Sequence, residues 1–278
     1  MRSRILYLRS PQWSGLLARP DQAFDHAEFR EVKNIARNRA GFFASPQGVV
    51  FVKRFVPGSW VEGMLERVRG SRTARSLRAA EMLIEAGFLV PAPLAAGEEI
   101  AGGAVRASWL FSEALTGALV MSRFIERGHA PARDERLKRR AALSAVAGCV
   151  RRLHDSGLFT SDMQETNLML DEAQGELRIH FVDLDGFRRL PRVSWKRRRR
   201  NLVQLDRSVG RFMSRAERLR FLYDYLGADS DRTAMRNLVG RLMRERERKD
   251  REVARRRARM GGVFGARRVT SPRRLTSQ

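Results

Sequence analysis

The residues best suited to chemistry lie in one stretch, residues 160–186, which reads TSDMQETNLMLDEAQGELRIHFVDLDG. Within it Asp162 precedes Asn167 by five positions, and Asp183 follows Asn167 by sixteen. Carboxylate and amide oxygens are ligands that Mg²⁺ takes in proteins, and a carboxylate can also accept a proton from an attacking hydroxyl. The stretch therefore fits a phosphoryl-transfer centre, with an ordinary acidic loop as the alternative.

Phosphoryl transfer also needs a cation that offsets the charge on the phosphates. Lys53 ends the apolar run GVVFVK at residues 48–53, which is typical of a β-strand. A lysine at a strand end is usually solvated. Together with the acidic residues downstream, however, Lys53 becomes the expected phosphate ligand.

Short β-strands and one helix are predicted around this lysine. Two antiparallel strands should flank the turn signal SPQG at residues 45–48. Residues 70–87 should form a helix, because apolar residues recur at helical spacing before a terminal glycine. Its predicted apolar face consists of Leu77, Ala80, Leu83 and Ile84.

The acidic stretch needs its own supporting elements. Residues 105–111 read as a further strand, residues 137–154 as a buried helix, and residues 179–182 as a short strand ahead of Asp183. From Val193 onward the pattern is helical and strongly basic. The order predicts a β-rich N-terminal part with one helix, a connector, and an α-rich C-terminal part.

Composition sets the limits on function. The 278 residues are 43% hydrophobic and carry a formal net charge of +24, which suits one large domain or two lobes that share a cleft. Such a positive charge implies an anionic partner: nucleic acid, a membrane surface or a phosphate-rich substrate. Cys149 is the only cysteine, which argues against a disulfide framework and favours a reducing, intracellular location.

Membrane contact, where it occurs, is expected to be peripheral. No 18 apolar residues run together, and the N-terminus has no apolar stretch of signal-peptide length. The basic run at residues 196–200 and the charge-dense end of the chain could attract anionic lipids, at about 1 kcal/mol per basic residue near the surface. Nucleic acid is the less favoured partner, because no helix-turn-helix, RRM or zinc-finger pattern is visible.

Between residues 32 and 210 several motifs resemble, in order and spacing, the bacterial lipopolysaccharide kinases of the protein-kinase-like superfamily, which phosphorylate Kdo or heptose sugars of the inner core. The motifs are VFVKRF at residues 50–55, RGSRTA at 69–74, GFLVPAP at 87–93, LHDSG at 153–157, Asp162-x4-Asn167 followed by LML, and FVDLD at 181–185.

The resemblance implies an α+β, bilobal protein-kinase-like fold with a β-rich N-lobe and an α-rich C-lobe. It also implies ATP and Mg²⁺ as cofactors. Asp162 would be the catalytic carboxylate, and Asn167 and Asp183 would hold the metal. Lys53 would bind the α- and β-phosphates of ATP, and Asp185 matches the second acid of the family's Asp-x-Asp.

The nucleotide's adenine would meet the backbone of the interlobe hinge at Ser112, Glu113 and Leu115. The family also has a glutamate that pairs with the strand lysine. Ser76 occupies its usual position, so Glu81, on the same predicted helix, is expected to substitute for it.

Other positions also differ from the family pattern. Thr160 stands where a histidine is usual, Gln164 stands where many relatives have a basic side chain, and Gly41 is the only glycine where a glycine-rich loop is expected. These differences leave open a non-catalytic, kinase-like protein that binds anionic membrane or nucleic acid.

The expected organisation is an N-lobe over residues 1–111, a hinge over 112–118, a helical C-lobe over 119–243, and a basic helix with a disordered tail over 244–278. The leading hypothesis is a kinase acting on a Kdo or heptose hydroxyl of the lipopolysaccharide inner core. It would work at the cytoplasmic face of the inner membrane. A kinase for another small molecule or for a protein is the alternative.

Overall fold

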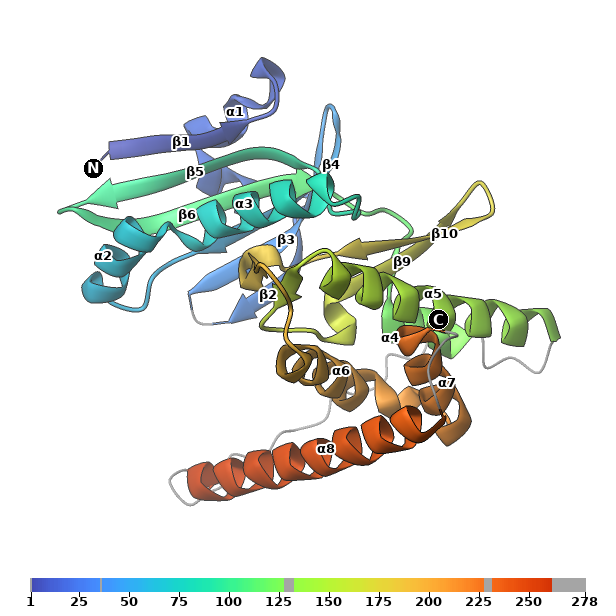
Figure 1. The fold of residues 1–278 in the computed structure, drawn as a ribbon. Coiled ribbons are helices and arrows are strands. Elements are labelled where there is room, and N and C mark those ends of the chain that lie inside the picture. Colours follow the sequence, from blue (N-terminus) through green and yellow to red (C-terminus); the bar gives the residue numbers. More distant parts are fainter. Residues whose placement is uncertain (1, 36, 128–132, 228–231, 262–278) are drawn as a thin grey trace. The chain divides into compact units, whose positions relative to one another are not determined.

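A six-stranded antiparallel sheet organises the first half of the chain (Figure 1). The computed structural model describes residues 2–35, 37–127, 133–227 and 232–261. The strand order is β1-β5-β6-β4-β3-β2. The strands are β1 (Arg2–Leu8), β2 (Arg30–Ile35), β3 (Asn38–Ser45), β4 (Gly48–Phe55), β5 (Pro93–Ala101) and β6 (Ala104–Glu113).

Alternation along β4 separates a core from a cleft. Val50 and Val52 are fully buried on one face, where they pack with Trp109 and Phe111. The first residues of the chain cover this face through three short helical segments, Pro11–Trp13, α1 (Gly15–Ala18) and Pro20–Phe24. Because successive side chains of a strand point to opposite faces, Lys53 projects from the other face, toward the second half of the molecule.

Two helices, α2 (Trp60–Arg69) and α3 (Arg72–Glu85), connect β4 to β5 (Figure 1). The predicted helix at residues 70–87 is therefore confirmed, and Leu77, Ala80 and Leu83 are buried as expected. Ile84 is an exception at 54% exposed, because it lies in the last turn at the margin of the buried face. Sequence reasoning did not foresee α2.

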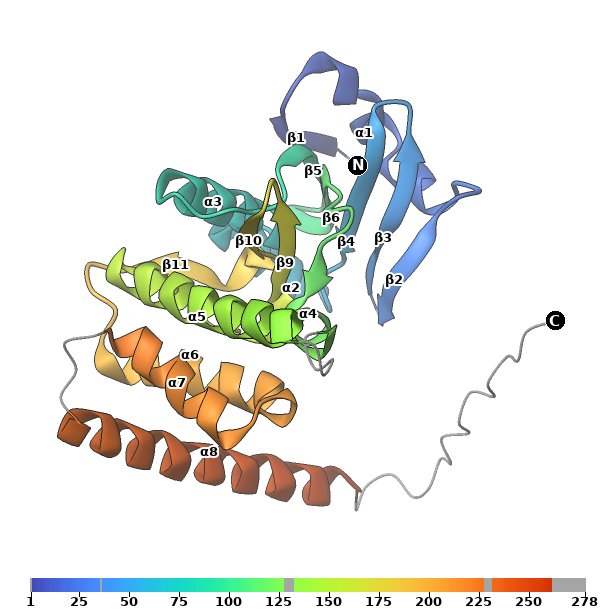
Figure 2. The same cartoon turned by 90° about the vertical axis from the view of Figure 1, so that its right-hand side faces the viewer.

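The second half of the described chain is mainly helical, with short strands inserted (Figure 2). Its helices are α4 (Met121–Arg127), α5 (Arg133–Asp155), α6 (Trp195–Val209) and α7 (Arg215–Leu226). Its strands are β7 (Leu119–Val120), β8 (Leu158–Thr160), β9 (Leu168–Ala173), β10 (Glu176–Phe181) and β11 (Phe187–Arg189). The helix predicted at residues 137–154 lies within α5, and the strand predicted at 179–182 corresponds to the end of β10.

The chain divides into two compact units, Met1–Ser230 and Asp231–Gln278. The second contains α8 (Arg232–Gly261), which is rich in charge and has ion pairs one turn apart, such as Arg246–Asp250 at 3.6 Å. α8 continues without a break across residue 244, where a fraying helix was expected to begin. The predicted disordered tail beyond residue 261 lies outside the described residues.

Candidate active site

A cavity of about 330 Å³ opens between the large sheet and the β9–β10 hairpin. Its lining is mostly apolar, with Phe51, Leu110 and Met169 among the contributing side chains. Lys53, Asp183 and Glu113 are the charged residues among those that line it. A mostly apolar hollow with a few converging polar groups is the usual form of a small-molecule site, so this cavity is the candidate ligand site.

The predicted pair Lys53 and Asp183 meets in this cavity. Lys53 Nζ lies 2.9 Å from Asp183 Oδ1, and the two side chains are 22% and 37% exposed. Lys53 arrives from β4, whereas Asp183 directly follows the strand β10 and Val182. The ion pair therefore joins the two halves of the cleft.

The conformation of Asp183 is unusual for a residue other than glycine. Its φ is 58° and its ψ 63°, a left-handed conformation that costs free energy for such a residue. Burial works to raise the pKa of its carboxyl, but Lys53, Arg72 and Lys33 outweigh burial and hold that pKa below its ordinary value. The carboxylate is therefore kept charged and directed at the cavity.

Asp185, two residues later, pairs with a cation from α3. Arg72 Nε donates to Asp185 Oδ2 at 2.7 Å, and the guanidinium also stacks on Phe55 at 4.7 Å from the ring centre. Arg72 belongs to the RGSRTA motif, but its partner is 113 residues away and its role was not foreseen. The two acids of the Asp-Leu-Asp turn thus each bind a cation from the N-terminal half.

The prediction for Glu81 is not supported by the structure. Glu81 lies exposed on α3, whereas Ser76 and Ala80 are the α3 residues that line the cavity. The reason is helical register: Glu81 is five residues beyond Ser76 and one beyond Ala80, so it projects about 100° away from the cavity-facing residue Ala80. Among the described residues, Lys53 has Asp183 rather than a helix glutamate as its carboxylate partner.

Asp162 and Asn167 lie together in the loop after β8. Asn167 Nδ2 donates to the main-chain oxygen of Asp162 at 3.0 Å and to its Oδ2 at 3.3 Å. The main-chain oxygen of Asn167 accepts from Val182 N at 3.0 Å, which places it beside the segment that leads to Asp183. Gln164 also donates to Asp162 Oδ1. The structure thus brings the predicted loop residues next to the predicted metal-binding segment.

The donors present suit Mg²⁺. The amide nitrogen of Asn167 faces Asp162, so its Oδ1 remains available as an acceptor, and Asp183 contributes carboxylate oxygens at the cavity. Within the described ranges, no group of three or more His, Cys, Asp or Glu residues gathers at one point. One carboxylate and one amide match the pattern in which Mg²⁺ uses few protein ligands and completes its shell with phosphate and water oxygens.

A buried network of hydrogen bonds anchors the loop of Asp162 to helices α5, α6 and α7. Asn201, fully buried on α6, donates from Nδ2 to the Thr160 carbonyl at 2.8 Å, and its Oδ1 lies 3.1 Å from His154 Nε2. Since a carbonyl can only accept, the amide nitrogen must face Thr160 and the amide oxygen must face the imidazole. His154 Nε2 therefore carries the proton, and Nδ1 accepts from the Tyr225 hydroxyl at 2.8 Å.

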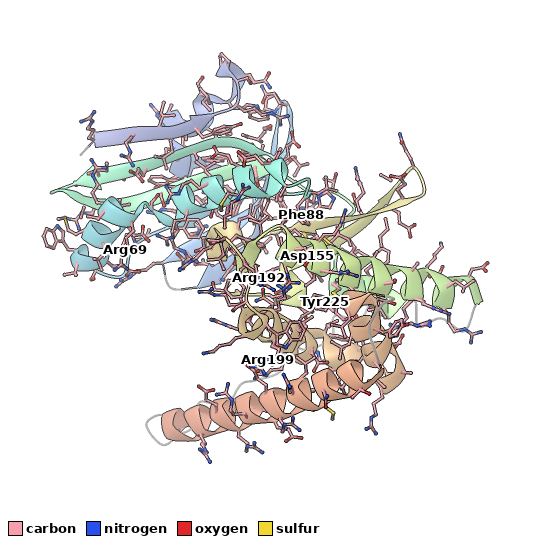
Figure 3. The ribbon with its side chains drawn as sticks, in the orientation of Figure 1. Arg69, Phe88, Asp155, Arg192, Arg199 and Tyr225 are labelled. Atoms are coloured by element: carbon pink, nitrogen blue, oxygen red, sulfur yellow. The ribbon has the colours of Figure 1, made fainter. Side chains whose placement is uncertain are left out.

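This network is uncharged. Burial lowers the pKa of His154 to about 4 and raises that of Tyr225 to about 12. Figure 3 labels Tyr225 on α7 and Asp155 at the end of α5, the helix that carries His154. This geometry gives His154 a structural role rather than the role of a base. Asn201 was missed, because nothing near it in the sequence marks it as a partner of the loop.

Close packing holds the loop against the Asp-Leu-Asp turn. Ser161 N donates to the Gly186 carbonyl at 3.1 Å, and β11 pairs with β8 through Phe187 and Thr160. A β-carbon on Gly186 would come within 2.8 Å of Ser161 Oγ, so only glycine fits here without displacement. The hydroxyl of Thr160 accepts from Asp162 N at 3.2 Å, so the residue at this unusual position fixes the loop directly.

The expected hinge residues Ser112, Glu113 and Leu115 line the same cavity. The backbone N–H of Glu113 donates to Ala92, and that of Ala114 donates to Val49. The N–H of Leu115 is therefore the first in this segment without a backbone acceptor among the described residues. A planar base with a ring nitrogen could accept from it.

The fold and this cleft define a kinase-like protein, with a sheet-rich N-terminal part, a helical C-terminal part and the acidic turn between them. In a comparison with solved structures, the chain is similar to "WaaP in complex with acyl carrier protein", with a TM-score of 0.64 and 23% identity over 89% of this chain and 99% of that chain. The predicted fold class is thereby confirmed.

The model of the lipopolysaccharide kinase (Kdo/WaaP) family matches residues 61–225. The chain belongs to this family, and the resemblance carried by the motifs is confirmed. No curated protein matches the chain. Membership establishes a kinase of the lipopolysaccharide type, whereas the roles of Asp162, Asn167, Asp183 and Lys53 stay predictions.

Proposed function

We propose that this protein transfers the γ-phosphate of ATP to a hydroxyl of a Kdo or heptose sugar in the lipopolysaccharide inner core. The observation that carries the proposal is the meeting of Lys53, Asp183 and the hinge segment in one cavity, next to the loop of Asp162 and Asn167. Family membership supports the reaction type, and the cavity supports a bound nucleotide.

In the proposed reaction the acceptor oxygen forms a bond to the γ-phosphorus, and the bond from that phosphorus to the β–γ bridging oxygen breaks. The acceptor proton passes to the Asp162 carboxylate, and ADP leaves with the electron pair of the broken bond. Lys53 binds the α- and β-phosphates, and Asn167 and Asp183 hold Mg²⁺. The bound metal offsets the charge that develops on the phosphate oxygens.

The acceptor is proposed to be strongly anionic. Arg200 on α6 donates to the Ser161 carbonyl at 3.4 Å, one residue before Asp162. Five exposed cations in this region have no carboxylate partner among the described residues: Arg188, Arg192, Lys196, Arg197 and Arg200. Inner-core sugars carry carboxylates and phosphates, so a cationic surface beside the loop suits them by charge.

The substrate proposal also implies work at a lipid surface. Among the residues that the structure describes, no helix combines the length and apolar character needed to cross a bilayer. Because the proposed substrate is a glycolipid, we propose peripheral contact with the inner face of the inner membrane, to which the basic surface of α6 adds electrostatic attraction for anionic headgroups.

Turnover of ATP on purified core glycolipid tests the proposal. Wild-type protein should release ADP and phosphorylate the glycolipid, and both Asp162→Ala and Asp183→Ala should lose this activity. Unchanged turnover in the two variants would refute the assigned site.

Two alternatives give different results in the same experiments. A kinase for another small molecule or for a protein would raise its melting temperature with ATP and Mg²⁺ but would leave the glycolipid unmodified. A non-catalytic protein would show no Mg²⁺-dependent rise with ATP. The second outcome would also remove the proposed role of Lys53, because the lysine would then have no phosphate to bind.

A further inference from the structure

Helix α2 has its apolar side facing outward. Val61, Leu65 and Val68 follow one another at spacings of four and three residues and are 61%, 44% and 83% exposed. Residues at this spacing form one stripe along a helix. Trp60, at the start of the helix, extends the stripe and is 51% exposed. We call these four side chains the α2 stripe.

The opposite side of α2 contains the residues that would ordinarily face water. Gly63 packs so closely on β6 that a β-carbon there would lie 2.4 Å from the Val105 carbonyl. Glu66 is buried, and burial raises the pKa of its carboxyl. The helix thus buries a glycine and a glutamate while four large apolar residues remain exposed. This inversion shows that sheet packing does not account for the α2 stripe.

The neighbouring helix α3 makes the contrast clear. α3 has an apolar face of similar size but turns it toward the protein, with Leu77, Ala80 and Leu83 buried. Contiguous exposed apolar surface on a folded protein usually marks a contact site. The α2 stripe therefore needs an occupant from outside the described fold.

The charges around the α2 stripe identify the kind of occupant. Arg67 and Arg69 are exposed in the last turn of α2, and Arg78 of α3 donates to the Arg69 carbonyl at 3.2 Å. None of these three has a carboxylate partner among the described residues. Figure 3 labels Arg69 at this end of α2. At the other end, Arg37 donates to the Gly58 carbonyl just ahead of the helix.

The exposed acid on α2 does not balance these cations. The Glu62 carboxylate accepts a hydrogen bond from the Gly58 N–H, and the Glu62 N–H donates to the Ser59 hydroxyl that caps the helix. Glu62 is therefore part of the helix start. An apolar helical face with a tryptophan and a cationic border is the pattern of helices that lie in the lipid–water interface.

We propose that α2 docks the protein on an anionic lipid bilayer, with the α2 stripe inserted among the headgroups and the arginines on lipid phosphates. The choice of a bilayer over another occupant rests on the proposed glycolipid substrate. Only Gly70 and Ser71 separate α2 from α3, whose first residue, Arg72, binds Asp185 of the Asp-Leu-Asp turn. Docking through α2 therefore holds the membrane close to the element that borders the cleft.

Vesicle flotation tests the proposal. The full chain should float with vesicles of phosphatidylcholine containing 30% phosphatidylglycerol, and the double variant Leu65→Asp/Val68→Asp should bind at least tenfold more weakly. Leu219→Asp is the matched control, because Leu219 is 47% exposed on α7 and lies in the other lobe. Its binding should equal that of the wild type.

A second variant separates charge from apolar insertion. Arg67→Glu/Arg69→Glu should weaken binding several-fold in low salt and reduce its dependence on salt, because part of the salt-sensitive attraction is removed. Flotation of Leu65→Asp/Val68→Asp at the wild-type level would overturn the proposal. So would a wild-type dimer in lipid-free solution that this double variant converts to a monomer, since the stripe would then bind a second copy.

The flotation experiments distinguish failure of the docking proposal from failure of the proposed reaction. Loss of flotation in Leu65→Asp/Val68→Asp, with an unchanged rise in melting temperature on adding ATP and Mg²⁺, supports docking by a folded protein. If wild-type protein floats but phosphorylates neither vesicle-bound glycolipid nor delipidated core, the reaction fails while docking stands. If core phosphorylation occurs but flotation does not depend on α2, docking fails while the reaction stands.

Discussion

The C-terminal wall of the cleft is held by uncharged hydrogen bonds in the interior, whereas the N-terminal wall is held by ion pairs that cross the cleft. Beneath Asp162, the buried groups Thr160, Asn201 and His154 bond to one another. On the other wall, Lys53 and Arg72 bond to Asp183 and Asp185. The first set lies entirely within the C-terminal part. The second depends on both walls being present.

This difference separates two functions. A buried network fixes its members in one geometry, because any unpaired member is costly. A partly exposed ion pair is weaker and more easily exchanged. The loop that would take the proton is therefore fixed in one geometry, whereas the residues that would bind nucleotide and metal can exchange their hydrogen-bond partners when ligands bind.

The largest effect is expected at the loop itself. Asp162→Asn keeps the size of the side chain but removes its capacity as a base. The turnover number should fall on the order of 10²–10⁴-fold, while the melting temperature and the KM for ATP stay near the wild-type values. Gln164→Ala, which removes a donor to the same carboxylate, is the control and should change turnover far less. An equal loss in both variants would contradict a proton-accepting role for Asp162.

The next effect concerns the buried support. Asn201→Leu leaves the Thr160 carbonyl and His154 Nε2 without partners. Each unpaired buried group costs about 1–3 kcal/mol, so the free energy of unfolding should fall by about 2–6 kcal/mol. Urea denaturation measures this loss, and the turnover number should fall with it because the loop loses its anchor. A loss no larger than that of a surface substitution such as Glu172→Ala would mean that the network does not stabilise the loop.

Acid should reveal the same network through His154. Its pKa is near 6.5 unfolded and about 4 in the folded protein, so the unfolded chain binds more protons between these values. The stability from the neutral histidine is fully present above pH 6.5 and is lost as the pH falls toward 4, by on the order of 3 kcal/mol. Urea midpoints from pH 4 to 7 should show this slope, and His154→Gln should flatten it.

A carboxylate gives the contrasting pH range. The hydrogen bond between Glu217 and Arg139 lowers the pKa of the Glu217 carboxyl to about 2. The contribution of this carboxylate to the stability is therefore present above pH 4.5 and is lost between pH 4.5 and 2. A wild-type slope confined below pH 4.5 would therefore assign the acid sensitivity to carboxylates instead of His154.

Much of the cleft could be predicted, because its residues sit in ordered local patterns. Lys53 lies in a recognisable strand, β4, which continues to Phe55, and Asp162, Asn167 and Asp183 flank short strands at fixed spacing. Arg72 and Asn201 could not be predicted, because each acts on a segment 113 or 41 residues away. The placement of Glu81 has the same origin: the sequence predicts the helix that carries it, but register decides which residue of that helix faces the cavity.

The same distinction between predictable and unpredictable features applies to the fold. Strands β4 and β6 and helices α3 and α5 follow from periodicity and turn signals. Helix α2 has a clear apolar stripe, yet periodicity cannot say whether a stripe points inward or outward. Packing of Gly63 on β6 decides this, and packing is a tertiary property.

A moderate effect is expected at the ion pair of the N-terminal wall. Arg72→Gln removes the partner of Asp185, whose side chain is 19% exposed. Because the pair is partly solvated, the free energy of unfolding should fall by only about 1 kcal/mol, whereas the KM for ATP should rise several-fold as the Asp-Leu-Asp turn loosens. Arg72→Lys should restore part of both. Wild-type kinetics in Arg72→Gln would show that Asp185 needs no cation from α3.

The smallest effect is expected at Glu81. Its carboxylate is exposed on α3 and lies outside the lining of the cavity, so Glu81→Gln should leave the turnover number and the KM for ATP within about twofold of wild type, and the melting temperature unchanged. The comparison with Arg72→Gln, on the same helix, is informative because both substitutions remove one charge. If Glu81→Gln raised the KM for ATP as much as Arg72→Gln does, α3 would have to turn during the reaction to bring Glu81 to Lys53. The N-terminal wall would then be more mobile than its ion pairs indicate.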